Sequence, residues 1–172
     1  MKRLFAAATL SLALMLALPA IADDDPQSLV GKDAPQVKLP LLGGGELDIA
    51  AFKGKKYVVL DFWASWCPWC RKSTEHFLKT AEKYKDKDVA FYMVAVRDKE
   101  EAIKKYLTDN GISPQLALDP KRDMADPYLV DGIPHIVVID KEGKIVKVAV
   151  GEDKVGPAME EALAAAFGAE SK

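Results

Sequence analysis

Residues 57–70 read YVVLDFWASWCPWC, an apolar run that leads directly into a pair of cysteines. The run is continuous rather than alternating, which is typical of a central strand that is covered on both faces. Cys67 and Cys70 are the only cysteines in the chain. Two thiols at this spacing, where a strand gives way to a helix, can close a small disulfide and reopen it. The stretch therefore predicts a redox site that needs no metal and no cofactor beyond its own disulfide.

The two cysteines are expected to have different roles. We predict a helix from Pro68 to about Tyr84, with Cys67 at or just before its first turn, where unpaired backbone N–H groups and the helix dipole lower the pKa of a thiol. Cys70 lies one turn further along, on the apolar stripe that includes Thr74. We therefore expect Cys67 to be exposed and to attack a substrate disulfide, and Cys70 to resolve the mixed disulfide. The alternative is an inert bridge, although so short a loop would stabilise the fold little.

Asp61 is the one charged residue within the apolar strand. Burial of an unpaired carboxylate is unfavourable and raises its pKa, which makes the group a proton acceptor near neutral pH. The resolving thiol must lose a proton before it attacks, so Asp61 is a candidate general base for Cys70. The alternatives are a carboxylate that is hydrogen-bonded to backbone, or a strand turned so that Asp61 faces water.

The sequence Gly132-Ile133-Pro134-His135 directly precedes another predicted strand. If the bond before Pro134 is cis, the Ile133 backbone is free to pair with an extended peptide beside the cysteines; the alternative is an ordinary turn proline. Two interpretations stay open for His135. Its ring either lies near the thiols and tunes them, or opens the strand partly in solvent.

The tryptophans also divide into two groups. Trp63 ends the apolar run and is expected in the core. Trp66 and Trp69 flank the predicted nucleophile and are candidates for an apolar rim that contacts a protein substrate. His76 falls on the exposed side of its helix by spacing. A closed zinc site would require His76 and His135 together with both cysteines, a set that the sequence supports only weakly.

The chain of 172 residues begins with a segment typical of export. Residues 1–22 combine a basic start, an apolar stretch too short for a membrane span, and a small-residue cleavage site after Ala22. They predict a cleaved signal peptide and a periplasmic protein, with an uncleaved membrane anchor as the alternative. We expect a flexible lead-in at 23–29, one domain at 30–168 and a tail at 169–172. With 24 basic and 26 acidic residues in the chain, no basic surface for nucleic acid is expected.

The rest of the chain alternates strands with helices, which predicts an α/β fold with helices around a mixed central sheet. Asp98 and Glu101 resemble a capping pair that opens a second long helix, which ends near Gly111. The remaining expected elements are an N-terminal hairpin at 36–42 and 46–49, strands at 89–96 and 116–118, a short helix at 124–126, a hairpin at 135–139 and 145–150, and a last helix that stops before Gly168.

Residues 62–70 and 132–134 together resemble the thioredoxin superfamily, and the chain looks most like its exported TlpA/ResA branch. That branch includes the reductases of cytochrome c maturation. Further likeness is found at residues 30–35, 118–120 and 139–144. The resemblance implies a thioredoxin-like fold in which the helix and strand between Lys99 and Asp119 form a central insertion.

The resemblance also implies roles for single residues. Cys67 would be the exposed nucleophile and Cys70 the resolving thiol, Asp61 would be the buried acid, and Pro134 would be a cis-proline that shapes substrate docking, with Ile133 before it. The chain departs from the family at three places. Residues 89–96 offer no lysine to pair with the buried acid, and two positions differ from the common residues: Trp69 replaces a proline and His135 replaces a threonine.

These observations favour a periplasmic thiol-disulfide oxidoreductase that reduces protein disulfides. A membrane-bound thiol donor would recharge it, and we expect it to act as a monomer. The residues between the cysteines, Pro68 and Trp69, influence its reduction potential, so an oxidant or an isomerase of the same fold is the first alternative. The second is a Cu(I) chaperone with Cys67, Cys70 and His135 as ligands. Copper chaperones of this fold commonly space their cysteines one residue wider, which weakens that alternative.

Overall fold

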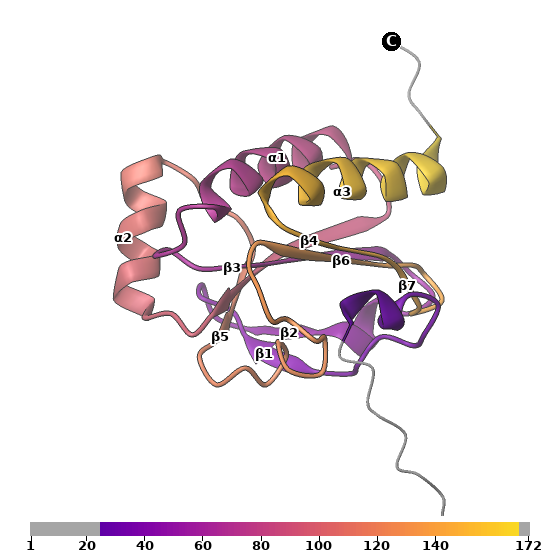
Figure 1. Cartoon of the computed structure of the whole chain (residues 1–172), viewed down its shortest axis with the longest axis horizontal. Helices are drawn as coiled ribbons and strands as arrows, with labels where there is room; N and C mark the ends of the chain where they lie inside the picture. Colours follow the sequence, from indigo (N-terminus) through magenta and orange to yellow (C-terminus); the bar gives the residue numbers. More distant parts are fainter. Residues whose placement is uncertain (1–24, 169–172) are drawn as a thin grey trace, which may run out of the picture.

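A five-stranded mixed sheet forms the centre of the fold, with the strands in the order β5-β4-β3-β6-β7 (Figure 1). The central strand β3 runs parallel to β4 and antiparallel to β6, and β5 and β7 extend the two sides. The strands are β3 (Tyr57–Trp63), β4 (Val89–Val96), β5 (Leu116–Asp119), β6 (His135–Ile139) and β7 (Ile145–Val150). The predicted α/β fold with a mixed sheet is confirmed.

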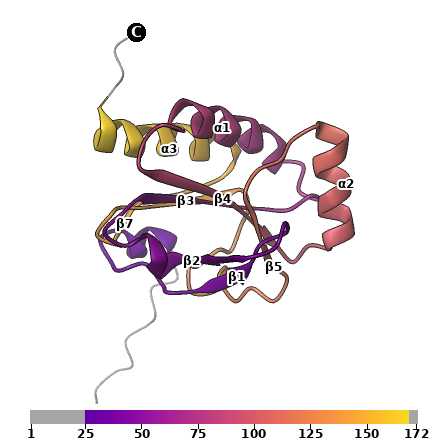
Figure 2. The same ribbon diagram turned by 180° about the vertical axis from the view of Figure 1, so that it is seen from behind.

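Helices cover one face of this sheet, and a small hairpin covers the other (Figures 1 and 2). α1 and α3 lie side by side on the first face, while α2 stands beyond one side of the sheet. The opposite face carries the predicted N-terminal hairpin, which forms a separate two-stranded sheet. The bounds are α1 (Cys70–Lys83), α2 (Glu100–Asn110), α3 (Glu152–Phe167), β1 (Lys38–Pro40), β2 (Glu46–Asp48), and the 3-10 helices η1 (Pro26–Leu29) and η2 (Ile49–Phe52).

The computed structural model describes residues 25–168, so the predicted signal peptide at 1–22 and the tail at 169–172 lie outside the described residues. Within 25–168, no helix is both long enough and apolar enough to cross a bilayer.

The central strand β3 is buried on both faces, which explains its continuous apolar sequence. Alternate side chains of a strand point to opposite faces. Leu60 and Phe62 accordingly belong to the core beneath the hairpin, and Val59 and Trp63 belong to the core beneath α1 and α3. Trp63 is fully buried, as predicted. By the same alternation, Asp61 shares the face that α1 covers.

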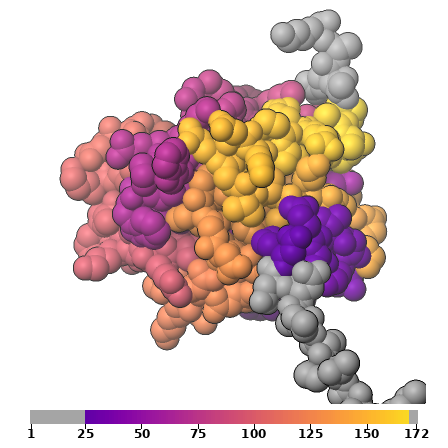
Figure 3. Space-filling model, viewed as in Figure 1, coloured from indigo at the N-terminus to yellow at the C-terminus, as the bar shows by residue number. Residues whose placement is uncertain are grey.

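The structure describes residues 25–29 of the lead-in that we expect at 23–29. Residues 26–29 form η1, whose first turn is capped by the Asp25 side chain. The Gln27 side chain donates a hydrogen bond to the carbonyl of Val148 in β7, and Leu29 is buried. Figure 3 shows this N-terminal segment lying against the C-terminal part of the chain. These contacts fix the segment on the sheet.

The short helix expected at 124–126 is a series of turns instead. The carboxylate of Asp119, at the end of β5, accepts hydrogen bonds from the backbone N–H groups of Met124 and Ala125. The Asp119 side chain therefore provides the hydrogen-bond acceptor that a helix would otherwise supply to these N–H groups.

Helices α1 and α3 approach closely at His76. A Cβ atom added to Gly156 of α3 would lie 3.0 Å from Cγ of His76, so a larger residue at 156 would displace the imidazole. His76 is exposed, as predicted, but its ring lies against α3. Glu160 of α3 links the same two helices by accepting hydrogen bonds from Thr80 and Lys83.

Candidate active site

Cys67 and Cys70 are joined by a disulfide in the turn between β3 and α1, with their Cα atoms 5.4 Å apart. The turn is closed by hydrogen bonds from the Cys67 N–H to the Ala64 carbonyl and from the Cys70 N–H to the Cys67 carbonyl. The helix begins at Cys70 rather than at Pro68, so the predicted start is wrong by two residues. Cys67 consequently precedes α1 and does not lie in its first turn.

The expected exposure of Cys67 is also wrong. Only 4% of Cys67 and 1% of Cys70 are exposed. The Cys67 sulfur lies 3.8 Å from the carbonyl oxygen of Ile133, a residue that is distant in sequence. The Ile133–Pro134 bond is cis, as the resemblance implies, and Pro134 is buried. The buried disulfide is therefore in contact with a segment that local spacing does not reveal.

Two tryptophans stand beside the buried disulfide. Trp66 is 60% exposed and Trp69 is 64% exposed, and they are the most exposed large apolar side chains that the structure describes. The Trp66 indole N–H lies 3.4 Å from the carbonyl oxygen of Arg97 and donates to it, which directs the ring toward the end of β4. Exposed aromatic surface beside a reactive group marks a contact site for another molecule.

Buried hydroxyl groups anchor the start of α1. Ser73 and Thr74 both donate hydrogen bonds of 2.8 Å to the Cys70 carbonyl oxygen. Thr74 was expected on the inward stripe, whereas Ser73 was missed. A serine that bonds to the preceding turn can be buried without an unsatisfied hydroxyl. The carbonyl of Cys70 is thereby fixed from within its own helix.

Asp61 is fully buried, and neither of its carboxyl oxygens has a hydrogen-bond partner among residues 25–168. Its neighbours across the sheet are Met93 in β4 and Ile136 in β6, so no lysine lies opposite it. Burial raises the pKa of this carboxyl to about 7. The two alternatives considered above, a backbone hydrogen bond and exposure to water, are both wrong. A carboxyl with a pKa near neutrality therefore lies on the face of the sheet that α1 covers.

His135 opens β6 on the opposite face from Asp61. It pairs with Phe62 of β3, and the two rings lie edge to face with centroids 5.7 Å apart. The imidazole is fully buried, with no hydrogen-bond partner for either nitrogen among residues 25–168. Burial lowers its pKa to about 4, although the nearby Asp131 carboxylate opposes the shift. The ring therefore lies neither among the groups around the disulfide nor partly in solvent, contrary to both interpretations.

The position of His135 also removes the ligand sets considered for metals. Its ring points into the core beneath the hairpin, whereas the cysteines belong to the core beneath α1. Within residues 25–168, no three His, Cys, Asp or Glu side chains are grouped as metal ligands. Neither the zinc set with both histidines nor the copper set with His135 is brought together.

Sequence reasoning missed a contact that Asp98 makes with the active-site turn. The expected capping pair does not form, because α2 begins at Glu100 without a side-chain cap. The Asp98 carboxylate instead accepts a hydrogen bond of 2.6 Å from the backbone N–H of Ser65 and another from Lys99. A helix-capping pattern could not have revealed a partner 33 residues away. Asp98 thus fastens the turn that carries Trp66 and Cys67.

Asp98→Ala is expected to destabilise the protein by about 1–2 kcal/mol, because it leaves a partly buried backbone N–H without its charged acceptor. Urea unfolding of the oxidised protein measures the change. Asp98→Asn keeps an oxygen acceptor and is the matched control, which should lose less. If Asp98→Ala unfolds at the wild-type urea concentration, the contact does not fasten the turn.

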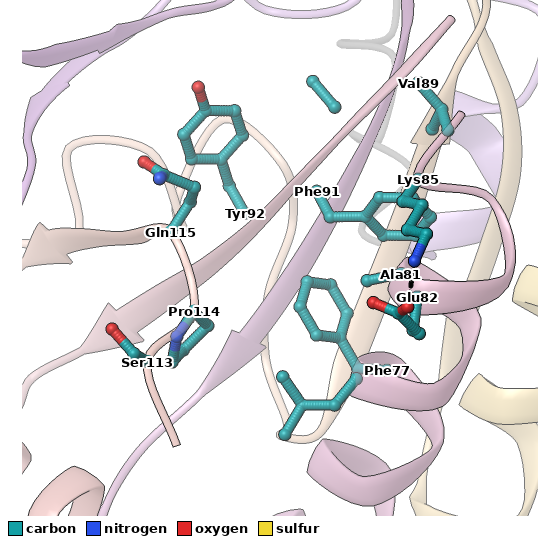
Figure 4. A pocket seen from close by; sticks show the side chains of 12 residues that line it. Phe77, Ala81, Glu82, Lys85, Val89, Phe91, Tyr92, Ser113, Pro114 and Gln115 are labelled. Atoms are coloured by element: carbon teal, nitrogen blue, oxygen red, sulfur yellow. Dashed lines mark hydrogen bonds and ion pairs between the residues drawn. The ribbon is translucent and has the colours of Figure 1, made fainter. Parts of the chain in front are cut away.

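A hollow of about 430 Å³ lies between the C-terminal half of α1, the start of β4 and residues 113–115 (Figure 4). Its aromatic lining residues are Phe77, Phe91 and Tyr92, and the ion-paired Glu82 and Lys85 also line it. Neither cysteine lies in its lining, and neither does Asp61. The disulfide, not this hollow, is the candidate active site.

Comparison with known proteins gives a consistent result. The family model described as Redoxin matches residues 29–166. The thiol-disulfide oxidoreductase ResA of Bacillus thuringiensis (strain Al Hakam) is 30% identical over 129 residues, or 75% of this chain and 74% of that protein. The solved thioredoxin domain of a thiol-disulfide oxidoreductase from Bacteroides vulgatus is 36% identical, with a TM-score of 0.66, covering 77% of this chain and 96% of that one. The solved structure of a thiol:disulfide interchange protein from Bacteroides sp. is 35% identical, with a TM-score of 0.64. The match covers 77% of this chain and 88% of that one.

Proposed function

We propose that this chain, which belongs to the redoxin family and is a TlpA/ResA-like member of the thioredoxin superfamily, reduces disulfides of exported proteins in the periplasm. Its family and its Cys67–Cys70 pair make it a thiol-disulfide oxidoreductase. One observation carries the proposal that the substrates are proteins: the disulfide is buried, is in contact with the Ile133 carbonyl oxygen and lies beside two exposed tryptophans. Such a site favours an extended polypeptide over a free small thiol.

The proposed reaction transfers two electrons from the reduced protein to the substrate. The Cys67 thiolate attacks one sulfur of the substrate disulfide; a bond forms between Cys67 and that sulfur, and the substrate disulfide breaks. The sulfur that leaves takes up a proton. Cys70 then loses its proton and attacks the Cys67 sulfur, which closes the Cys67–Cys70 disulfide and releases the second substrate thiolate. The protein ends oxidised and the substrate ends as a dithiol.

Asp61 is proposed to take the proton from Cys70 in the second step. With a pKa of about 7, the carboxyl is partly ionised at neutral pH and is able to accept a proton. It has no hydrogen-bond partner among the described residues that would compete for the proton. Ile133 is proposed to present its backbone to the substrate, and Trp66 and Trp69 to contact its apolar surface.

The cycle requires a reductant that restores the Cys67–Cys70 dithiol. We propose a membrane-bound dithiol donor that transfers two electrons by the same exchange in reverse. The periplasmic location rests on the signal-like residues 1–22, and a role in cytochrome c maturation rests on the resemblance to the TlpA/ResA branch. We expect the protein to act as a monomer, with its own disulfide as the only redox group.

The equilibrium reduction potential tests the direction of electron flow. A reductant is expected below about −200 mV, nearer to thioredoxin at about −270 mV than to the oxidant DsbA at about −120 mV. The protein is equilibrated with glutathione buffers, and its oxidised fraction is measured by alkylation and mass spectrometry. Trp69→Pro, which changes only a residue between the cysteines, shows how far that residue sets the value. A wild-type potential near −120 mV would make the protein an oxidant and overturn the proposed direction.

A further inference from the structure

We propose that Asp98 is a positioning residue for substrate recognition: it holds the active-site turn so that the Trp66 ring is preset to contact a polypeptide bound at Cys67. This inference rests on the proposed function, because it concerns how the same site recognises its substrate. Trp66 directly precedes Cys67 and is 60% exposed, so a chain joined to Cys67 by the mixed disulfide lies within reach of the ring. Asp98 acts through Trp66 and is assigned no contact with the substrate.

Residues 97 and 98 follow the end of β4 and bind two consecutive residues of the active-site turn. The Asp98 carboxylate accepts a hydrogen bond of 2.6 Å from the Ser65 N–H, and the Arg97 carbonyl oxygen accepts one of 3.4 Å from the Trp66 indole N–H. We call this pair of residues the Arg97–Asp98 corner. The first bond fixes the backbone directly before Trp66, and the second fixes the outer end of its side chain.

The two hydrogen bonds differ in strength. A bond to a carboxylate is about twice as strong as one between neutral groups, and the bond from Ser65 is also short. The indole bond, at 3.4 Å, is longer than most N–H···O bonds and is weak by itself. The indole of Trp66 therefore keeps its partner only while the backbone at Ser65 stays in place. Through Ser65, Asp98 controls the direction of the Trp66 ring.

The Arg97–Asp98 corner is itself held in place. The second carboxylate oxygen of Asp98 accepts a hydrogen bond of 2.8 Å from the Lys99 N–H, and the Arg97 N–H donates one of 3.2 Å to the Asp119 carbonyl. The Arg97 backbone has a φ of 50°, which is uncommon for a residue other than glycine. A backbone in such a conformation persists where surrounding contacts determine it, and it is frequent at functional sites. The corner is thus a fixed support for the turn.

Trp69 provides a comparison within the same site. It is 64% exposed and lies beside the same disulfide, yet its indole N–H has no hydrogen-bond partner among residues 25–168. Of two similarly exposed rings, Trp66 is the one whose indole is held and whose preceding N–H is bound. A side chain that is ordered before binding loses less conformational entropy when its partner binds. The contacts of the Arg97–Asp98 corner therefore favour Trp66, and not Trp69, as the preset contact for a substrate.

The test compares two substrates of the reduced protein. One is a short peptide with a single cysteine flanked by leucine, present as its methyl disulfide, and the other is bis(2-hydroxyethyl) disulfide. In both reactions the Cys67–Cys70 dithiol loses two electrons and two protons and becomes the disulfide; the peptide yields its thiol and methanethiol, and the small disulfide yields two molecules of mercaptoethanol. Both rate constants are measured by mass spectrometry, and the readout is their ratio, peptide over small disulfide. A loss of folded protein or of Cys67 reactivity changes both rate constants alike and leaves the ratio unchanged.

Variants assign the effect to Asp98 and Trp66. Asp98→Ala should lower the ratio about three- to tenfold, the size expected when one aromatic contact is misplaced. Asp98→Asn keeps an oxygen acceptor for the Ser65 N–H and should retain about half or more of the wild-type ratio. Should Asp98→Ala not fold, Asp98→Ser replaces it, because the serine hydroxyl is one bond shorter than the carboxylate and does not reach the Ser65 N–H.

A double-mutant cycle shows whether Asp98 acts through Trp66. Trp66→Ala should lower the ratio, and adding Asp98→Ala to it should lower the ratio no further, since the ring that Asp98 positions is absent. Trp69→Ala is the matched background. In it, Asp98→Ala should still lower the ratio by the full amount, because the Arg97–Asp98 corner does not hold Trp69.

The possible results are distinguishable. An unchanged ratio in Asp98→Ala would show that Asp98 only stabilises the fold; it would overturn the inference, and the proposed function would stand. An unchanged ratio in Trp66→Ala, or a further loss when Asp98→Ala is added to Trp66→Ala, would also overturn it. If the wild-type protein does not reduce the peptide disulfide, the proposed function fails, and this inference fails with it.

Discussion

Cys70→Ser is expected to stop catalysis after its first half and to accumulate mixed disulfides between Cys67 and substrate proteins. The first exchange requires only the Cys67 thiolate, whereas release requires a second sulfur that attacks it. The serine oxygen does not replace that sulfur, so the adduct persists. Affinity purification under non-reducing conditions, followed by mass spectrometry of proteins released by reductant, measures the trapped complexes.

Cys67→Ser is the matched control for the trap, because it retains one thiol of the same pair. Cys70 is only 1% exposed and lies at the first position of α1, so this variant should capture little or nothing. Adducts recovered equally with Cys67→Ser would reverse or abolish the assigned roles. A Cys70→Ser trap that recovers no exported protein would sink the proposal that this chain reduces protein disulfides.

The central strand and the cysteine pair could be predicted because their signals are local. A short apolar run rich in β-branched and aromatic residues, such as 57–63, favours a buried strand over a helix, and cysteines three positions apart are close enough to form a disulfide. The burial of Cys67 could not be predicted in the same way. Cys67 contacts Ile133, which lies 66 residues further along the chain, and a helix-start pattern carries no information about so distant a neighbour.

Two other predictions failed because a local pattern had more than one physical solution. Asp98 followed by Glu101 fits a helix cap, yet the carboxylate binds the Ser65 N–H across the active-site turn. For His135, the alternation of side chains along a strand does not decide which of the two faces of the sheet the ring occupies. Only the pairing of His135 with Phe62, one residue beyond Asp61, fixes the ring on the face away from α1. In both cases the deciding information is tertiary and has no counterpart in spacing.

Asp61→Asn is expected to stabilise the folded protein at alkaline pH and to have little effect in acid. The folded pKa of Asp61 is about 7, against an ordinary value of 3.8, so the folded state retains a proton that the unfolded state has already lost. The wild-type protein therefore loses stability as pH rises from about 4 to 7, and the loss approaches about 4 kcal/mol above pH 7. Asparagine stays neutral, so unfolding by denaturant at pH 4 and pH 8 should show this difference only at pH 8.

The same substitution separates the catalytic role of Asp61 from its effect on stability. If Asp61 accepts the Cys70 proton, Asp61→Asn should slow the release of substrate from the mixed disulfide about 10²-fold or more, while the first attack by Cys67 proceeds. The rate of release should also lose its inflection near pH 7. Asp119→Asn is the matched control, since Asp119 is equally buried but bonds the N–H groups of Met124 and Ala125. A fully buried carboxyl without a partner weakens the fold at neutral pH, so a variant that gained stability yet kept the wild-type release rate would leave Asp61 without a function that explains its burial.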